Sequence, residues 1–222
     1  DVTTKNIYDN SGRLVYTIDA EGYVSENVYD AAGNVIEIKD YSDLNVAEYA
    51  KTTSYLSAGN NIDKIVIAAG DSANTSITKV YDEEKGRDVV KLEGDGVSNG
   101  YRLKGEGWEN WNNESQKVIS WDMRYDETYE IYISVDTEKG HRYLFYYAGA
   151  GEPYLQNNAY AWHYLDAEET KSGSWVNIQR DLVADLAEVE PDNKILDVNS
   201  FMIRGSGYID NIELKGGVSV ED

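Results

Sequence analysis

Arginine and tyrosine side chains recur at the outward positions of several predicted strands, and these residue types can bind a sugar. The set comprises Arg124, Tyr132, Arg142, Tyr146 and Arg204. Aromatic rings present an apolar face to the CH groups of a pyranose, while guanidinium groups donate fixed hydrogen bonds to hydroxyls. An ordinary solvated sheet face would carry more Lys, Thr and Glu. The pattern predicts a carbohydrate-binding surface, and a solvated or packed structural face is the alternative.

Three tryptophans are candidate stacking platforms for a sugar ring. Trp108 and Trp111 lie in a loop rich in Gly and Asn, where a large apolar ring is rarely left in solvent. Trp162 shares one side of a predicted strand with Tyr160 and Tyr164. For the loop pair the alternative is a ring that plugs the end of the fold. For the Trp162 stripe the alternative is a place in the hydrophobic core.

Residues that could perform catalysis do not form a recognisable motif. The two histidines, His141 and His163, lack metal-ligand spacing, and there is no Gly-x-Ser-x-Gly nucleophile motif. Glycoside hydrolysis needs two carboxylates about 5–10 Å apart. Some pair among 41 acidic residues meets that distance by chance. We therefore expect a protein that is not an enzyme, with a polysaccharide lyase using His163, Tyr146 and Arg142 as a minor alternative.

The amino-acid composition indicates a globular protein and argues against several kinds of binding partner. The chain has 222 residues, of which 41% are hydrophobic and 27% charged, as in globular proteins. Its net charge of −21 argues against nucleic acid and anionic membranes as partners. No apolar run is long enough for membrane insertion, and the lack of cysteine excludes disulfides, thiol catalysis and Cys-ligated zinc. The sequence starts without Met or a signal peptide, so we expect a piece of a longer chain.

A succession of β-strands must position the candidate residues. The 19 tyrosines and 5 tryptophans favour pleated sheets, and the 19 glycines suit tight turns. The predicted strands span 76–81, 88–93, 101–104, 116–125, 129–136, 141–148, 160–164, 174–180, 199–204 and 208–215. One short helix is expected over 181–188, where apolar residues have helical spacing. The pattern predicts an all-β protein, an antiparallel β-sandwich of jelly-roll type.

Alternation along each strand assigns one side to the core. In strand 129–136 the inward residues are Ile131, Ile133 and Val135. Strand 141–148 is harder to orient because both of its sides contain aromatic residues. We assign its inward side to Tyr143, Phe145 and Tyr147. Its outward side then carries Arg142, Leu144 and Tyr146.

The first part of the chain contains an internal repeat. The pattern that runs from Tyr8-Asp9 to Gly12 returns from Tyr29-Asp30 to Gly33, a period of 21 residues. Asp caps a turn and Gly supplies a positive φ, so each unit predicts a β-hairpin. These residues resemble the YD repeats of Rhs-type giant surface and toxin proteins, over about two units. The resemblance implies an exported or cell-surface parent protein, and plain hairpins flanking a larger domain are the alternative.

The expected organisation has four parts. Residues 1–43 are YD-type hairpins, and 44–74 are a linker with a possible short helix over 44–51 and a strand over 62–69. Residues 75–216 form the jelly-roll module, and 217–222 are a tail.

The larger part also resembles a known group of modules. The strings Ile119-Ser120-Trp121-Asp122-Met123 and Gly207-Tyr208-Ile209-Asp210-Asn211 are similar to those of bacterial β-jelly-roll modules of the carbohydrate-binding type. In many such modules the Asp of the closing strand helps to hold a structural calcium ion, and Asp210 matches it by position. Asp82, Glu84 and Asp88 are the expected further ligands, since calcium prefers oxygen. The alternative for these three is a solvated acidic turn.

We therefore predict a monomeric, non-catalytic module that binds a polysaccharide or surface glycan, within a large extracellular bacterial protein. A structural or adhesive spacer without a sugar ligand is the first alternative, and a lyase or hydrolase of jelly-roll fold is the second. The arginines in so acidic a chain hint at a ligand with carboxylates or sulfates.

Overall fold

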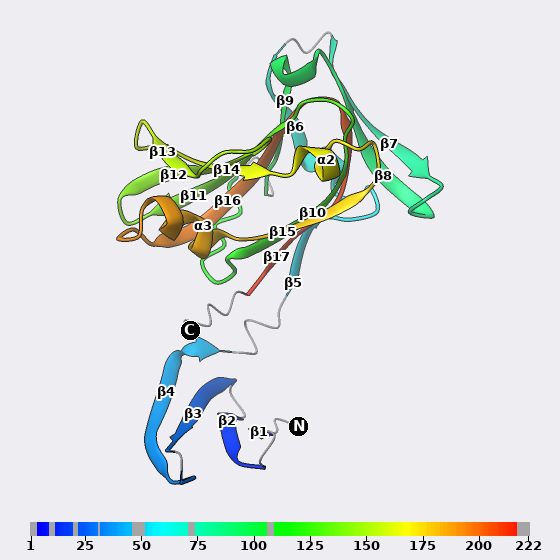
Figure 1. Ribbon diagram of the computed structural model, residues 1–222. Helices are drawn as coiled ribbons and strands as arrows, with labels where there is room; N and C mark the ends of the chain where they lie inside the picture. Colours follow the sequence, from blue (N-terminus) through cyan, green and yellow to red (C-terminus); the bar gives the residue numbers. More distant parts are fainter. Residues whose placement is uncertain are drawn as a thin grey trace. The chain divides into compact units, whose positions relative to one another are not determined.

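The structure is a computed structural model that describes residues 4–8, 12–19, 22–30, 32–45, 52–70, 74–105 and 109–216. The chain divides into two compact units, Asp1–Lys51 and Thr52–Asp222 (Figure 1). No helix among the described residues has the length and apolar character needed to cross a bilayer.

The first unit is a four-stranded antiparallel sheet in sequence order. Its strands are β1 (Lys5–Tyr8), β2 (Leu14–Ile18), β3 (Tyr23–Tyr29) and β4 (Val35–Asn45). Gly12 and Gly33 occupy equivalent positions of the repeat, and both have positive φ values of 79° and 87°. The Asp30 carboxylate accepts hydrogen bonds from the backbone of Ala32 and Asn34. Both hairpins that the repeat predicts are therefore present. In the second, Asp30 and Gly33 provide the expected turn chemistry, while Asp9 of the first lies outside the described residues.

The second unit is a β-sandwich of two sheets (Figure 1). The six-stranded sheet consists of β15 (Val176–Asp181), β10 (Val118–Arg124), β17 (Gly207–Lys215), β8 (Arg87–Glu93) and β7 (Ser76–Asp82) in that order, with β5 (Thr52–Leu56) also paired to β17. The seven-stranded sheet has the order β13 (Tyr154–Gln156), β14 (Tyr160–Leu165), β12 (Gly140–Ala148), β11 (Glu130–Thr137), β16 (Ile195–Arg204), β9 (Gly100–Leu103) and β6 (Ile65–Ala69). The prediction of an all-β sandwich is confirmed.

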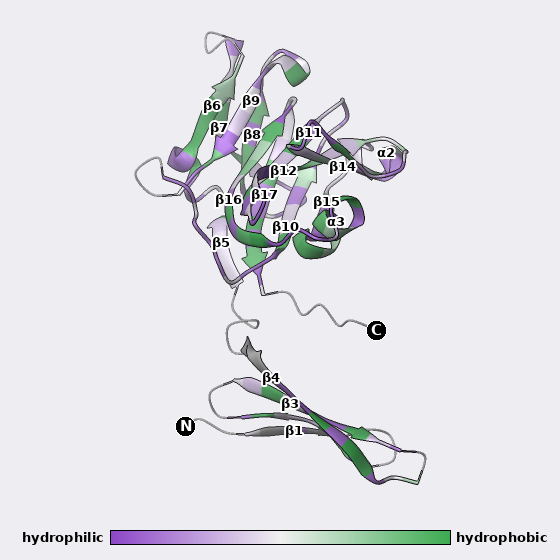
Figure 2. Cartoon of the chain, turned by 90° about the vertical axis from the view of Figure 1, so that its left-hand side faces the viewer, coloured by the Kyte–Doolittle hydropathy of each residue, from purple (hydrophilic) through white to green (hydrophobic). Residues whose placement is uncertain are grey.

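The core lies between the two sheets, and hydrophobic and hydrophilic residues are mixed along the same strands (Figure 2). Trp121 of β10 is fully buried and reaches across to the other sheet, with ring centroids 5.7 Å from Phe201 and 6.0 Å from Tyr146. One helix, α3 (Leu182–Val189), packs Leu182 and Leu186 into this core, as its apolar spacing predicts. The other helical pieces among the described residues are α2 (Ala167–Thr170), η1 (Ile62–Lys64) and η3 (Gly96–Ser98).

The structure differs from the expected linker between 44 and 74. Strands β5 and β6 belong to the two sheets of the sandwich, because β5 pairs with β17 and β6 pairs with β9. The sandwich therefore begins at residue 52 rather than 75, while residues 46–51 and 71–73 lie outside the described residues. The sheets are also not wholly antiparallel, since β12 and β14 run parallel.

Candidate functional site

The outer face of the seven-stranded sheet is the side that points away from the core. On β11 the inward residues Ile131, Ile133 and Val135 are fully buried, so Tyr132 and Ser134 point outward. Residues opposite each other on paired strands share a face. Tyr132 pairs with Phe145 of β12, and Ser134 pairs with Tyr143. The register therefore places Tyr143, Phe145 and Tyr147 on the outer face.

The orientation assigned to strand 141–148 from the sequence is thus wrong. Leu144 and Tyr146 are fully buried members of the core, and Arg142 shares their side of β12. Phe145 is also buried, yet it lies outside the core cluster. Its ring is covered from the outside by Trp162, with centroids 4.0 Å apart, and by Tyr132 at 4.6 Å.

Aromatic rings form a continuous layer on this outer face, which we call the aromatic platform. One row runs directly across the strands from Tyr154 to Trp162, Phe145 and Tyr132. Tyr154 stacks on Trp162 with ring planes 12° apart, and the Trp162 indole donates to Gln156 at 3.0 Å. The members of the platform are Tyr132, Tyr143, Phe145, Tyr147, Tyr154, Tyr160, Trp162 and Tyr164.

A pocket of about 220 Å³ opens beside the platform. Tyr132, Tyr143 and Tyr160 form its aromatic wall, and Met202 and Arg204 of β16 lie on the other side. Gly100 leaves room at this point, because a Cβ there would approach the Arg204 Cγ to 3.3 Å. The outer face is therefore hollowed at the boundary between its aromatic half and the half built by β16, β9 and β6.

Polar groups near the pocket are held by neighbouring side chains. The Tyr132 hydroxyl donates to Glu130 at 2.6 Å, and burial together with this bond raises the pKa of Tyr132, so the phenol keeps its proton. Arg204 lies over the Tyr132 ring at 5.9 Å and 3.7 Å from the Glu130 carboxylate. At the far end of β11, the hydrogen bond from His141 lowers the pKa of Asp136.

Arg102 of β9 lies on the same face, and it was not among the residues expected there from the sequence. It is the register partner of Met202 on β16, so it lies in the same cross-strand row as Tyr132. Its neighbours along the strand, Tyr101 and Leu103, are buried. Alternation within the predicted strand 101–104 would have placed residue 102 outward, and this was the available signal.

Solved structures with a similar arrangement include carbohydrate-binding modules. A family 11 module of a cellulosomal cellulase of Clostridium thermocellum aligns with 78% of this chain and 99% of that one, at 12% identity and a TM-score of 0.48. A family 11 module from the same organism, in complex with a β-1,3-1,4-mixed-linked tetrasaccharide, aligns with 75% of this chain and 96% of that one, at 12% identity and a TM-score of 0.47.

A Clostridium thermocellum xylanase fragment with a CBM22-1 and a GH10 module, complexed with xylohexaose, aligns with 78% of this chain and 29% of that one, at 11% identity and a TM-score of 0.40. No protein-family model and no curated protein matches the chain. Because all three TM-scores lie below 0.5, the case for a function rests on the side chains of the outer face.

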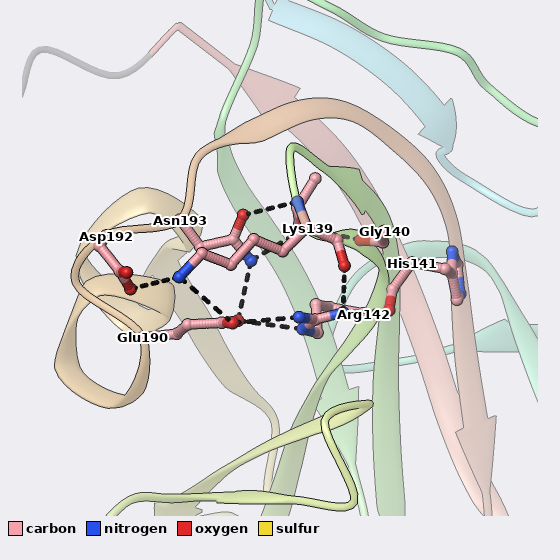
Figure 3. Close-up of polar contacts among 8 residues, drawn as sticks. Lys139, Gly140, His141, Arg142, Glu190, Asp192 and Asn193 are labelled. Atoms are coloured by element: carbon pink, nitrogen blue, oxygen red, sulfur yellow. Dashed lines mark hydrogen bonds and ion pairs between the residues drawn. The ribbon is translucent and has the colours of Figure 1, made fainter.

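Arg142 and Tyr146, both expected at the ligand surface, are instead structural. The Arg142 guanidinium forms a two-pronged ion pair with Glu190, at 3.0 Å for each contact, and also donates to the backbone carbonyls of Lys139 and His141 (Figure 3). The Tyr146 hydroxyl donates to Asp185 of α3 at 2.5 Å. His163 is buried too, so a lyase site made of these residues would be closed to a polysaccharide.

The other predicted sugar-binding residues divide between two places. Tyr132, Trp162 and Arg204 are brought together on the outer face. Arg124 lies on the six-stranded sheet, where it pairs with Asp82 at 2.7 Å and stacks over Tyr208 at 4.1 Å.

The two loop tryptophans expected as platforms have different outcomes. The Trp111 ring stacks on Tyr55 with centroids 3.7 Å apart and packs against the core, in keeping with the plug considered as its alternative. Trp108 lies outside the described residues.

The four expected calcium ligands do not form a common site. Asp82 is paired with Arg124, and the Asp210 carboxylate lies 2.8 Å from Arg87, although out of line for a hydrogen bond. Asp88 is 3.7 Å from Lys79, and Glu84 is exposed in the turn. Since side-chain cations already balance the two buried carboxylates, this donor set does not fit calcium, which prefers uncommitted oxygens.

Within the described part of the chain, one other group of potential metal ligands lies close together, namely His163, Asp185 and Glu188. Both Asp185 oxygens are already engaged by Arg180, and one also accepts from Tyr146. We therefore interpret this group as the polar contact through which α3 docks on β14.

Proposed function

We propose that the outer face of the seven-stranded sheet binds a polysaccharide chain without cleaving it. The observation that carries the proposal is the aromatic platform, whose rings lie outside the core although the sandwich already has a complete core between its sheets. Contiguous apolar rings on a surface mark a binding site rather than a folding need. Flat aromatic faces with a few fixed polar groups at their margin suit the CH patches and hydroxyls of sugar rings.

The size of the face suits a polymer. The row from β13 to β6 crosses seven strands, and at about 4.8 Å between neighbouring strands it is about 29 Å long. A surface of that length takes several consecutive sugar rings. We therefore infer a chain that lies across the strands, with ring faces on the platform and one ring in the pocket beside Tyr132.

Two acidic groups on this face are held by neighbouring side chains. Glu130 accepts the Tyr132 hydroxyl, and Asp136 accepts from His141 and Asn199. The pKa of Asp136 is lowered, so this carboxyl is ionised at neutral pH and is a poor proton donor.

We also infer that the module is a monomeric part of a large extracellular bacterial protein. The support is the 21-residue repeat, whose two units form matching hairpins with positive-φ glycines at Gly12 and Gly33. An exported parent with YD-type repeats would present a sugar-binding domain to glycans outside the cell.

Affinity gel electrophoresis tests the proposal. The panel contains soluble neutral polymers (mixed-linkage β-glucan, xylan and glucomannan) and acidic ones (glucuronoxylan, alginate and pectate). We expect retardation by at least one polymer, and Trp162→Ala should weaken it at least tenfold, about 1.4 kcal/mol. The control is Trp175→Ala, which removes a partly exposed tryptophan that immediately precedes β15 of the other sheet.

Each outcome decides between the functions considered. Retardation that Trp162→Ala abolishes and Trp175→Ala keeps supports binding at the platform. Retardation that survives Trp162→Ala contradicts this location. A folded protein that no polymer retards is a spacer rather than a binding module, and new reducing ends on incubation would show an enzyme.

A further inference from the structure

We propose that the end of the outer face built by β9 and β16 binds an anionic sugar residue, with the Arg102 guanidinium as its main contact. This inference rests on the proposed function and names the class of polysaccharide, one that carries carboxylate or sulfate groups.

The Arg102 side chain is oriented by neutral groups. Its Nε donates to the Ser200 hydroxyl at 3.0 Å, and its Nη2 donates to the Asn110 side-chain carbonyl at 2.6 Å. Ser200 is fully buried, so this anchor is rigid. A guanidinium has five N–H donors. Two are used by these contacts, which leaves three without a partner among the described residues.

No carboxylate in the described part of the chain forms an ion pair with Arg102, which is unusual in a chain of net charge −21. Arg124, Arg142 and Arg180, by comparison, are each paired with an aspartate or glutamate. With twice as many acidic as basic residues, an arginine held in place but left without a counter-ion points to one supplied by the ligand.

Arg204 adds a second positive charge at the same place. Met202 pairs with Arg102 and Arg204 with Gly100, so the two arginines are diagonal neighbours, about 7–8 Å apart at the backbone. Arg204 also lines the pocket and is only loosely compensated, because Glu130 lies 3.7 Å away and is shared with the Tyr132 hydroxyl. A sugar ring in the pocket would therefore lie beside Arg204, with Arg102 on the next strand beyond it.

Arginine suits this task better than lysine. Its planar fork donates two parallel hydrogen bonds to a carboxylate or sulfate, whereas a sugar hydroxyl takes one. In this arrangement the neighbouring tyrosines contact the sugar rings, and Arg102 selects rings that carry a carboxylate or sulfate group. The face thus combines a neutral half, over β13, β14 and β12, with a cationic end.

Matched pairs of polymers test the inference on the full chain. The carboxylate arm uses glucuronoxylan, alginate and pectate, each beside the same polymer after its uronate carboxyls have been reduced to alcohols. The sulfate arm uses κ-carrageenan beside its desulfated form. Affinity electrophoresis is run with the natural protein, Arg102→Gln, Arg102→Lys and the control Lys194→Gln. This control removes one positive charge at an exposed position just before β16, at the opposite end of that strand from Arg204.

We expect at least one charged polymer to bind at least tenfold more tightly than its neutral partner. Arg102→Gln should abolish this preference, Arg102→Lys should keep part of it, and Lys194→Gln should keep all of it. The arm that shows the preference identifies carboxylate or sulfate as the group bound.

Two results would overturn the inference and leave the proposed function intact. The first is equal or tighter binding of the neutral partners, and the second is an Arg102→Gln variant that weakens both members of a pair by the same factor. Absence of binding to every polymer here and in the wider panel would instead remove the proposed function together with this inference.

Discussion

The ion pair between Arg142 and Glu190 provides the sharpest test of which side of β12 faces the core. Only 6% of the Arg142 side chain and 12% of the Glu190 side chain are exposed. Glu190→Gln removes the charge that compensates the buried guanidinium while keeping the shape of the side chain. Removing one partner of a buried pair costs about 3–5 kcal/mol. We expect about 3 kcal/mol, the lower end, because the carbonyls of Lys139 and His141 still accept from Arg142.

The assay is differential scanning calorimetry with urea unfolding beside it. For a domain of 150–250 residues, 1 kcal/mol shifts Tm by about 2–4 °C, so we expect a fall of about 6–12 °C. Asp192→Asn is the matched control, because Asp192 also forms an ion pair in this network but its side chain is 79% exposed. Such a surface pair contributes about 0–1 kcal/mol.

The stability lost in Glu190→Gln should also depend on pH and should become smaller as the pH falls. The hydrogen bond from Arg142 lowers the pKa of Glu190 below its ordinary value of 4.5. A carboxyl with a lowered pKa stabilises the fold fully above its unfolded pKa, and this contribution is lost as the pH falls through the folded pKa. The difference between the natural protein and Glu190→Gln should therefore be full at pH 6 and shrink below about pH 4.5.

Polysaccharide affinity supplies the refuting result. Because Arg142 lies on the core side of β12, Glu190→Gln should lower stability and leave binding unchanged at temperatures where the variant is folded. A variant of natural stability that has lost its affinity would show that Arg142 faces the ligand, as the sequence-based assignment had it, and our register argument would fail.

Three further predictions follow from buried groups. Because arginines balance Asp82 and Asp210, we expect EDTA and added calcium to leave Tm unchanged, and a clear calcium-dependent rise in Tm would contradict this. Gly207→Ala would bring a Cβ within 2.6 Å of the buried Tyr125 ring, so we expect about 1–3 kcal/mol of destabilisation by urea unfolding, and a neutral result would mean that this ring shifts freely. Burial lowers the pKa of His163 below 6.5, so on acidification this histidine is protonated in the unfolded chain before it is protonated in the folded one. Tm should therefore fall as the pH drops below about 6.5. His163→Asn should show a smaller fall in Tm between about pH 7.5 and 5.5, and an equal fall would show that His163 is not responsible.

The strands were predictable because each alternates apolar and polar residues between clear turn signals. All ten predicted strands of the main domain are present, and the helix at 181–188 is found at Leu182–Val189. β5 was missed because its sequence has only two clearly apolar residues, Tyr55 and Leu56. Its strand character comes from pairing with β17, more than 150 residues away, and such long-range pairing leaves no local pattern.

The candidate site was predicted in part, and the error has a physical cause. On β12 both sides carry aromatic residues, so hydropathy alone does not orient the strand. The hairpin that joins β12 to β11 orients the strand. Thr137 pairs with Gly140 across a two-residue turn, and this register sets Ile133 opposite Leu144. A short turn fixes register, and applying that rule to Glu138-Lys139 would have placed Arg142 and Tyr146 inward.

The strand pair at one edge of the seven-stranded sheet has a consequence for how ligand preference can change. β13 and β14 supply half of the aromatic platform from one short segment, through Tyr154, Tyr160, Trp162 and Tyr164. The alternating residues Ala161, His163 and Leu165 face the interior and are buried. On the proposed function, the side chains that would contact the sugar and those that hold the fold are therefore interleaved along one strand. We expect a library randomised at the four outward positions to retain the sandwich and to sample new glycan specificities, so this edge is the place to re-engineer the module for other polysaccharides.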